Sequence, residues 1–192
     1  MELILKGDGK MFEGKLTRLR VYKKEDLKTV WNYINQENTM KFLRPGIPFP
    51  FKFEEEEKWY ESINGLSTKS YTFAIERKKD DEYLGGVGIN EIDWKNSYCE
   101  IGIFLAEDYC SQGYGTDALK VLIDFIFNEM NLNKVMLSVY SFNDRAQNSY
   151  KKAGFVEEGR LRDHIFRNGK YNDEIIMSIL RKEWEEMKKK GV

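Results

Sequence analysis

Cysteine, proline and histidine are scarce in this chain, whose 192 residues include two cysteines, three prolines and one histidine. Two cysteines are too few for a disulfide-stapled secreted domain, and no histidine accompanies them at zinc-ligand spacing. No apolar run approaches the roughly 18 residues that a membrane-spanning helix requires. Internal repeats and low-complexity linkers are also missing. We therefore expect a protein with no metal site and no membrane partner.

An excess of charge of one sign is lacking as well. The chain carries 31 Lys and Arg residues against 32 Asp and Glu residues, a formal net charge of −1. A protein that attracts nucleic-acid phosphates through its overall field is strongly basic, so we expect no nucleic-acid partner. The segment Met1–Lys10 mixes both charges and has no hydrophobic signal core, which predicts a cytoplasmic protein.

Apolar surface, in contrast, is sufficient for one core, because 41% of the residues are hydrophobic and 14% are aromatic. At roughly 150 residues per domain, a chain of this length predicts one folded domain. The mostly charged segment 181–192 predicts a C-terminal tail helix, and 1–15 is an N-terminal extension in this division of the chain.

The periodicity of apolar residues predicts helices and strands in a mixed order. The expected helices are Lys24–Glu37, Phe53–Ile63, Thr116–Met130, a helix capped by Asn143 that ends at Ala153, and a last one from Arg181. The expected strands are Tyr71–Glu76, Tyr83–Ile92, Tyr98–Leu105, Lys134–Tyr140 and a hairpin about Asn168 and Gly169. One helix joins the strands at 98–105 and 134–140, so these two should be parallel. The pattern predicts an α/β (α+β) fold whose mixed sheet has helices on both faces.

A loop with two glycines lies between the strand at 98–105 and the helix that follows it. It reads Cys110-Ser111-Gln112-Gly113-Tyr114-Gly115-Thr116. Glycines let backbone N–H groups approach a ligand closely, and the helix N-terminus adds free donors, so the loop suits a pyrophosphate. It is neither a Walker A loop nor a Rossmann fingerprint. The alternative is a turn that needs glycine for its geometry alone.

A second motif follows after one helix and one strand, in the segment Asn143–Phe155. It has the pattern Asn-x-x-Ala-x-x-x-Tyr-x-x-x-Gly-Phe. Together with the Gly-x-Gly loop, it resembles the GNAT family of acetyl-coenzyme A-dependent N-acetyltransferases over residues 16–180. The resemblance implies a single domain with a mostly antiparallel sheet of about seven strands. The final hairpin resembles the branch of spermidine and ribosomal-protein N-terminal acetyltransferases.

The resemblance also implies which residues bind acetyl-CoA, the expected co-substrate. The strand end should pair with the pantetheine arm, and a backbone N–H there should stabilise the oxyanion. The expected coenzyme contacts are Phe104, Leu105, Ala106, Cys110, Ser111, Gln112, Gly113, Tyr114, Gly115, Thr116, Asn143, Ser149 and Lys152. One residue departs from the family pattern, because Cys110 stands where the loop usually has Gln or Arg.

Acetyl transfer to an amine needs a base for the ammonium proton and an acid for the departing thiolate, whose pKa is roughly 8.5. Tyr150 matches the family's helix tyrosine, and we predict that it is the acid; the alternative is an ordinary core tyrosine. Glu91 is the leading candidate for the base, and Glu100 on the next strand could share a water chain with it. Both could instead be solvent-facing strand carboxylates. His164 lies in the terminal hairpin, where a structural role is the simpler interpretation.

The acceptor side is rich in carboxylates, and these favour a polyamine or another small amine. They are Glu37, Glu54, Glu55, Glu56, Glu57, Glu91 and Asp93. Consecutive glutamates point around a helix, so at most two share a face, and a charge run is usually a solvated surface. The aromatic loop Phe42–Phe53 suits a peptide N-terminus instead. A non-catalytic coenzyme A sensor is the third hypothesis, and a homo-oligomer stays open.

Overall fold

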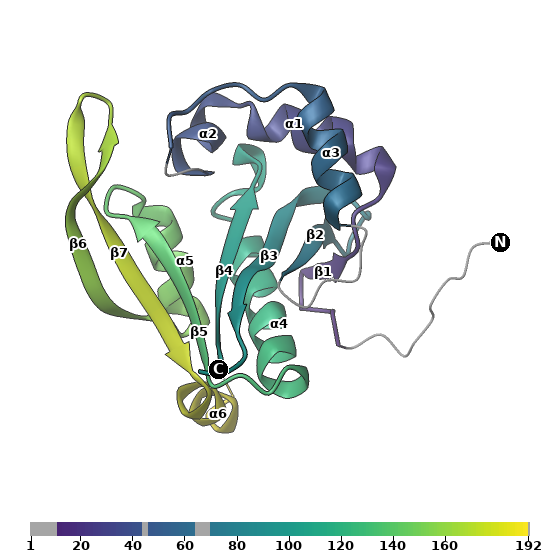
Figure 1. Ribbon diagram of the computed structural model, residues 1–192. Helices are drawn as coiled ribbons and strands as arrows, with labels where there is room; N and C mark the ends of the chain where they lie inside the picture. Colours follow the sequence, from purple (N-terminus) through teal and green to yellow (C-terminus); the bar gives the residue numbers. More distant parts are fainter. Residues whose placement is uncertain (1–10, 44–45, 64–69, 192) are drawn as a thin grey trace.

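The computed structural model describes residues 11–43, 46–63 and 70–191. In these residues, strands form one sheet in the order β1-β2-β3-β4-β5-β7-β6 (Figure 1). The strands are β1 (Thr17–Arg20), β2 (Tyr71–Arg77), β3 (Tyr83–Asp93), β4 (Tyr98–Leu105), β5 (Lys134–Tyr140), β6 (Val156–Arg167) and β7 (Lys170–Leu180). Neighbouring strands are antiparallel except β4 and β5, which are parallel. The predicted mixed, mostly antiparallel sheet is confirmed.

Helices cover both faces of the sheet, as expected. They are α1 (Leu27–Ile34), α2 (Glu37–Leu43), α3 (Phe53–Ile63), α4 (Tyr114–Glu129), α5 (Asp144–Ala153) and α6 (Arg181–Lys189), with 3-10 turns η1 (Lys24–Asp26) and η2 (Glu107–Tyr109). On one face, α4 buries Leu119, Leu122 and Ile126 in the main core, to which α5 and α6 also contribute. On the other face, α1 and α3 pack a second, aromatic-rich cluster around Tyr22 and Tyr83. None of the described helices is long and apolar enough to span a membrane.

The start of the chain differs from the expectation that helices come first. Strand β1 precedes them, with Thr17 and Leu19 buried and Arg18 and Arg20 on the other side. Both arginines pair with the buried carboxylate of Glu76 on β2, and Arg20 also binds Asp26 at 2.7 Å. Two arginines in a strand of four residues obscure the apolar pattern by which a strand is recognised in the sequence. Their charges are balanced by Glu76, which lies 58 residues after Arg18.

The single helix predicted over Lys24–Glu37 is also wrong. The segment consists of η1 and α1, and a separate helix, α2, then begins at Glu37, the residue at which the expected helix ends. Asn35 ends α1: its side-chain amide donates to the Trp31 carbonyl at 2.9 Å, while its carbonyl accepts from the Phe51 N–H at 2.7 Å. A side chain that bonds to backbone groups competes with the helix ladder, so α1 stops there.

The parallel pair at the centre of the sheet is short. Strands β4 and β5 pair only at Tyr98–Lys134, Cys99–Val135 and Glu100–Met136, and then diverge (Figure 1). Beyond Glu100, no described strand pairs with β4 on its β5 side. An unpaired strand edge offers backbone donors and acceptors to a ligand. The divergence therefore opens the sheet from one face to the other.

Asp117 in the first turn of α4 ties this helix to the start of β1. Its carboxylate accepts hydrogen bonds from the N–H groups of Lys15, Leu16 and Thr17 and from the Thr17 hydroxyl, at 2.7–2.9 Å. These contacts span about 100 residues of sequence and fix the N-terminus of α4 relative to the sheet.

We expect Asp117→Ala to lower the free energy of unfolding by about 2–4 kcal/mol, because several amide donors lose a charged acceptor. Urea unfolding followed by circular dichroism measures this change. Asp108→Ala is the matched control, because the Asp108 side chain makes no hydrogen bond within the described residues. Equal stability of the two variants would contradict the assigned role of Asp117.

Candidate active site

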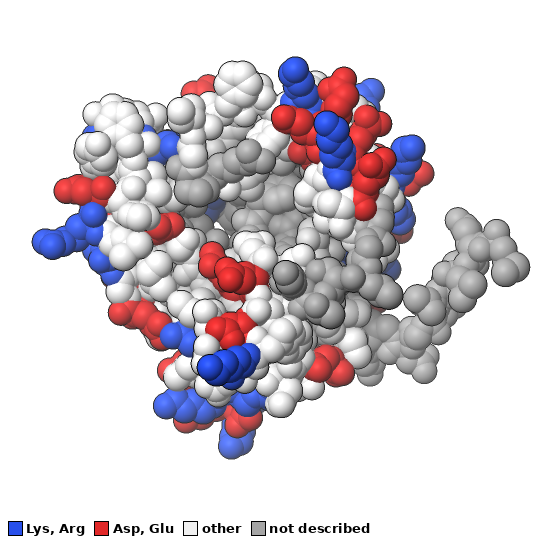
Figure 2. Space-filling view, viewed as in Figure 1, with Lys and Arg blue, Asp and Glu red and all other residues white. Residues whose placement is uncertain are grey.

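A cavity of about 1700 Å³ occupies the divergence between β4 and β5 and continues under α1, α2 and α3. Figure 2 shows the molecule hollowed near the centre of this face, with acidic side chains at the margin of the hollow. The N-terminal ends of α4 and α5 line one side of the cavity. Phe42 of α2 meets Phe142 at a ring distance of 5.8 Å, so the first helices reach across to the β5 side.

The Gly-x-Gly loop forms the end of the cavity at the start of α4. Ser111 and Gly113 adopt left-handed backbone conformations, with φ of 60° and 89°. Gly113 is the N-cap of α4, and no side chain caps this helix end. Alternating left-handed residues before a free helix N-terminus direct several N–H groups to one point, an arrangement that binds anions. The backbone geometry thus fits a phosphate group of coenzyme A.

Most of the predicted coenzyme contacts reach this cavity. Those that line it are Phe104, Leu105, Cys110, Ser111, Gly113, Gly115, Thr116, Asn143, Ser149 and Lys152. Ala106, Gln112 and Tyr114 are not among the lining residues. Ala106 is buried, the Gln112 side chain donates back to the Asp108 carbonyl at 2.6 Å, and the Tyr114 ring lies beneath the Arg77 guanidinium. The side chains of Gln112 and Tyr114 therefore have local roles.

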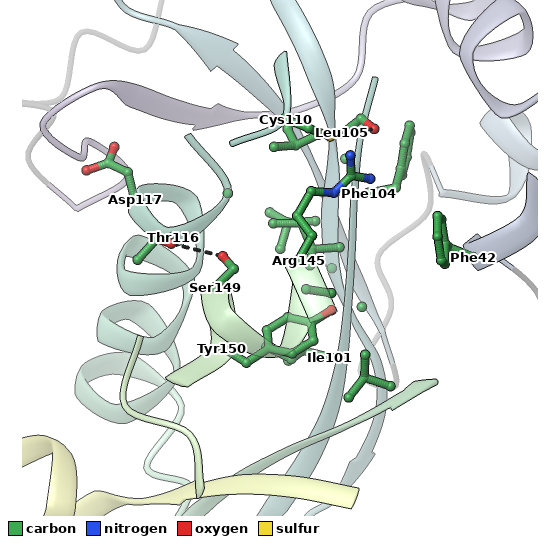
Figure 3. A pocket seen from close by; sticks show the side chains of 18 of the residues that line it. Phe42, Ile101, Phe104, Leu105, Cys110, Thr116, Asp117, Arg145, Ser149 and Tyr150 are labelled. Carbon is green, nitrogen blue, oxygen red and sulfur yellow. Dashed lines mark hydrogen bonds between the residues drawn. The ribbon is translucent and has the colours of Figure 1, made fainter. Parts of the chain in front are cut away.

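Helix α5 forms the opposite wall, and its ends are as the sequence predicts. The Asn143 side chain caps the helix by accepting from the Ala146 N–H at 3.2 Å, and Gly154 ends it with φ of 103°. The hydroxyls of Thr116 and Ser149 lie 2.9 Å apart and join α4 to α5 beside the loop (Figure 3). Gly113 and Asn143, the N-caps of α4 and α5, both line the cavity, so both helix N-termini face it.

Tyr150 lies on α5 and reaches the gap between the strands. Its side chain is almost completely buried, with 7% of the residue exposed, yet it lines the cavity. Figure 3 shows its hydroxyl pointing toward β4 near Ile101. Burial raises the pKa of Tyr150 to about 12, so the phenol stays protonated at neutral pH. The hydroxyl in the gap thus carries a proton that a leaving thiolate could take, and the same burial makes it a weaker acid than an exposed tyrosine.

The two candidate bases lie side by side on β3 and β4. Glu91 pairs with Glu100 across the strands, next to a bulge at Asn90. A bulge turns consecutive residues toward one face of a sheet. Both side chains are exposed, and Glu100 lines the cavity whereas Glu91 does not. Burial and the neighbouring carboxylates of Glu91 and Glu174 raise the pKa of Glu100.

Cys110 does not have the properties of a nucleophile. Its sulfur lies 3.5 Å from the Ala106 carbonyl, and burial raises the pKa of the thiol. A thiol with a raised pKa carries less of the reactive thiolate at neutral pH. Arg145 of α5 extends to this end of β4, near Leu105 and Cys110 (Figure 3). The guanidinium of Arg145 thus lies close to Cys110, the position at which the family pattern usually has Gln or Arg.

Of the acidic residues that the sequence singles out for the acceptor side, few reach the cavity. Glu56 is 7% exposed and lines it, whereas Glu54, Glu55 and Glu57 face outward. Glu37 is exposed at the start of α2, and Asp93 accepts from the Asn96 N–H in the β3–β4 turn. These positions agree with the expectation that at most two of the consecutive glutamates share one face.

Several charged lining residues escape the sequence analysis, among them Glu174 and Arg145. Glu174 of β7 lines the cavity from the far side of β5, and Arg145 lines it from α5. His164, the single histidine, lies 3.4 Å from Glu174. Glu174 and the loop after β4 are far apart along the chain, so only the strand order brings them to one cavity. Arg145 follows Asn143, the N-cap of α5, by two residues. This position next to the cap is the sequence feature from which its place at the cavity could have been predicted.

The family model described as "Acetyltransferase (GNAT) domain" matches residues 17–156 of this sequence. The chain belongs to the GNAT acetyltransferase family. The match contains the open edge of β4, the loop before α4 and the Asn143–Phe155 segment. The chain is thus an enzyme, and acetyl-CoA is its co-substrate.

Several relatives cover most of this GNAT chain. The spermidine N(1)-acetyltransferase of Escherichia coli (strain K12) is 30% identical over 171 residues, 87% of each chain. YdaF of Bacillus subtilis (strain 168), named as a ribosomal N-acetyltransferase, is 32% identical over 106 residues, which are 55% of this chain and 58% of YdaF. The crystal structure of spermidine N-acetyltransferase from Vibrio cholerae with CoA and spermine matches with a TM-score of 0.79. It is 28% identical and covers 88% of this chain and 98% of that one.

Among the described residues, no group of three or more His, Cys, Asp or Glu side chains lies together in a way that could hold a metal ion. The cavity instead offers backbone donors, a phenol and carboxylates. These groups suit direct acyl transfer.

We expect Tyr150→Phe to lower kcat by about 100-fold or more, because it removes a general acid from the reaction. The dissociation constant of coenzyme A should stay nearly unchanged, since the ring remains. Steady-state kinetics and calorimetric titration measure the two quantities. Tyr98→Phe, also a tyrosine-to-phenylalanine change but at a residue outside the cavity lining, is the control. An unchanged kcat for Tyr150→Phe would refute the assignment.

Proposed function

We propose that this enzyme transfers the acetyl group of acetyl-CoA to a primary amine of a polyamine or another small amine that carries more than one positive charge. The observation that carries the proposal is the separation of charge inside the cavity. Carboxylates line the side of the acceptor helices and the sheet face, and cations line the side of α4 and α5.

The acidic side of the cavity consists of Glu56, Glu100 and Glu174. Glu56 extends from α3, and its charge acts on the hydroxyl of Tyr22 in the aromatic cluster. Glu100 lies where β4 and β5 separate, and Glu174 lies on β7. Carboxylates at three places around an enclosed space favour an acceptor whose charges are positive and distributed along its length.

The basic side consists of Lys120, Arg145 and Lys152 on α4 and α5. Carboxylates also line this side, but other groups bind them. Asp117 accepts from the β1 amides, Asp124 binds Trp184 and Lys188, Glu13 binds Lys78, and Glu107 accepts from Asn38. Three cations beside the Gly-x-Gly loop suit the phosphates of coenzyme A. The two ligands would thus meet at the gap between the strands.

In the proposed reaction, the amine nitrogen attacks the thioester carbon at the gap, and the carbon–sulfur bond breaks. The amine loses its proton to the Glu100 carboxylate, directly or through water shared with Glu91. A backbone N–H on the open edge of β4 donates to the carbonyl oxygen as charge develops there. Tyr150 gives its proton to the departing sulfur and regains one from solvent. The raised pKa of Glu100 makes it a better base than an ordinary carboxylate.

The relatives support this choice of acceptor. Two spermidine N(1)-acetyltransferases align with 86–87% of the chain at 28–30% identity. A solved structure that contains spermine matches the fold. The alignment with YdaF, in contrast, covers 55% of the chain. A peptide N-terminus is therefore the second candidate acceptor.

We expect acetyl-CoA-dependent thiol release with spermidine or spermine to exceed the release with peptides that have a free Ser or Ala N-terminus. The measurement is kcat/KM for each acceptor, with an enzyme-only blank because Cys99 and Cys110 can react with the thiol reagent. Turnover with peptides alone would contradict a polyamine acceptor and would support N-terminal acetylation instead. Binding of coenzyme A without turnover of any amine would favour the sensor hypothesis.

A further inference from the structure

Glu174 shares the acceptor face of the sheet with Glu100, on the other side of the gap. Glu174 pairs with Tyr140 of β5, and Glu100 pairs with Met136 of the same strand. Tyr140 and Met136 are four residues apart, so their side chains point to the same face. Glu174 and Glu100 therefore point to that face too, and both line the cavity.

Along β5, the four residues from Met136 to Tyr140 correspond to roughly 13 Å of strand. Glu100 lies at the end of the gap where the strands join. Glu174 lies farther along the opposite wall. The two carboxylates are close enough for Glu174 to contribute to the raised pKa of Glu100. They are thus neighbours in one space without being in direct contact.

The surroundings of Glu174 leave its charge available to a ligand. Its side chain is 13% exposed, and the ion pair that it forms is with His164, whose own side chain is 52% exposed. This pair is charge-balanced only when His164 is protonated. The same wall carries Arg167, whose guanidinium lies 5.8 Å from the centre of the Tyr140 ring. A mostly buried carboxylate such as that of Glu174 is stabilised when a cationic ligand binds it.

Tyr150 offers a polar group to the same space. The residue is 7% exposed and lines the cavity, and its hydroxyl oxygen is not among the buried polar atoms that lack a partner, so it is open to the cavity. A hydroxyl in this position can donate a hydrogen bond to a bound substrate. The Tyr150 hydroxyl points from α5 toward β4 (Figure 3), and Tyr150, Glu100 and Glu174 all line the cavity.

We propose that Glu174 binds an ammonium group of the acceptor other than the one that is acetylated, so that the enzyme selects amines with at least two positive charges. This inference rests on the proposed function, because it assigns positions to the charges of a polyamine. The reacting amine lies near Glu100 and Tyr150, and the second ammonium group lies against Glu174. Glu174 is then a specificity-determining residue.

The test compares 1,4-diaminobutane with n-butylamine, two amines with the same carbon chain that differ by one ammonium group. Glu174→Gln keeps the shape of the side chain and removes its charge. We expect it to raise KM for the diamine about tenfold or more and to leave KM for the monoamine within a factor of two. Glu174→Asp should restore part of the preference. Glu186→Gln, on α6 and outside the cavity lining, is the charge-matched control.

Each outcome decides a different question. Wild-type enzyme that prefers the diamine, together with an unchanged preference in Glu174→Gln, would overturn this inference and leave the proposed function intact. An equal rise in KM for both amines would mean that Glu174 maintains the shape of the cavity rather than binding an ammonium group. This result would also overturn the inference. Wild-type enzyme that turns over peptides but neither amine would reject the proposed function itself, and this inference with it.

Discussion

The separation of β4 from β5 is the constraint on which the rest of the site depends. These strands are the parallel pair of the described sheet, because helix α4 crosses over between them, and they stay paired for three residues of each strand. Beyond Glu100 the sheet is open. The opening gives one edge of β4 to a ligand and lets Tyr150 reach through from α5. It also joins the coenzyme side of the sheet to the acceptor side.

The N-terminal ends of α4 and α5 meet the open edge of β4 at this opening. Contacts with other parts of the chain hold these elements in place. Asp117 fixes the start of α4 to β1, and the Thr116–Ser149 hydrogen bond fixes α4 to α5. The buried pair of Glu76 with Arg18 and Arg20 fixes β1 to β2. Groups that must act together are thus positioned by a rigid frame, and the charges inside the cavity are arranged by the order of the strands.

The sequence predicts those elements whose boundaries are set by residues within or next to the element itself. The boundaries of β4 and β5 agree with the alternation of apolar residues, and α5 begins and ends at its cap residues Asn143 and Gly154. The family motif leads to the loop at Gly113 and to Tyr150. Strand β1 was missed because its arginines are neutralised by a distant glutamate. Glu174 was missed because its place depends on β7 inserting between β5 and β6.

Amide hydrogen exchange along β4, with and without coenzyme A, tests the central claim that the coenzyme binds in this opening. We predict that saturating coenzyme A slows exchange in residues 101–105 and 113–116. Exchange in residues 74–76 of β2, which pair with both β1 and β3 and do not line the cavity, should not change. Unchanged exchange in both segments, under conditions where calorimetry shows the coenzyme to be bound, would contradict the account.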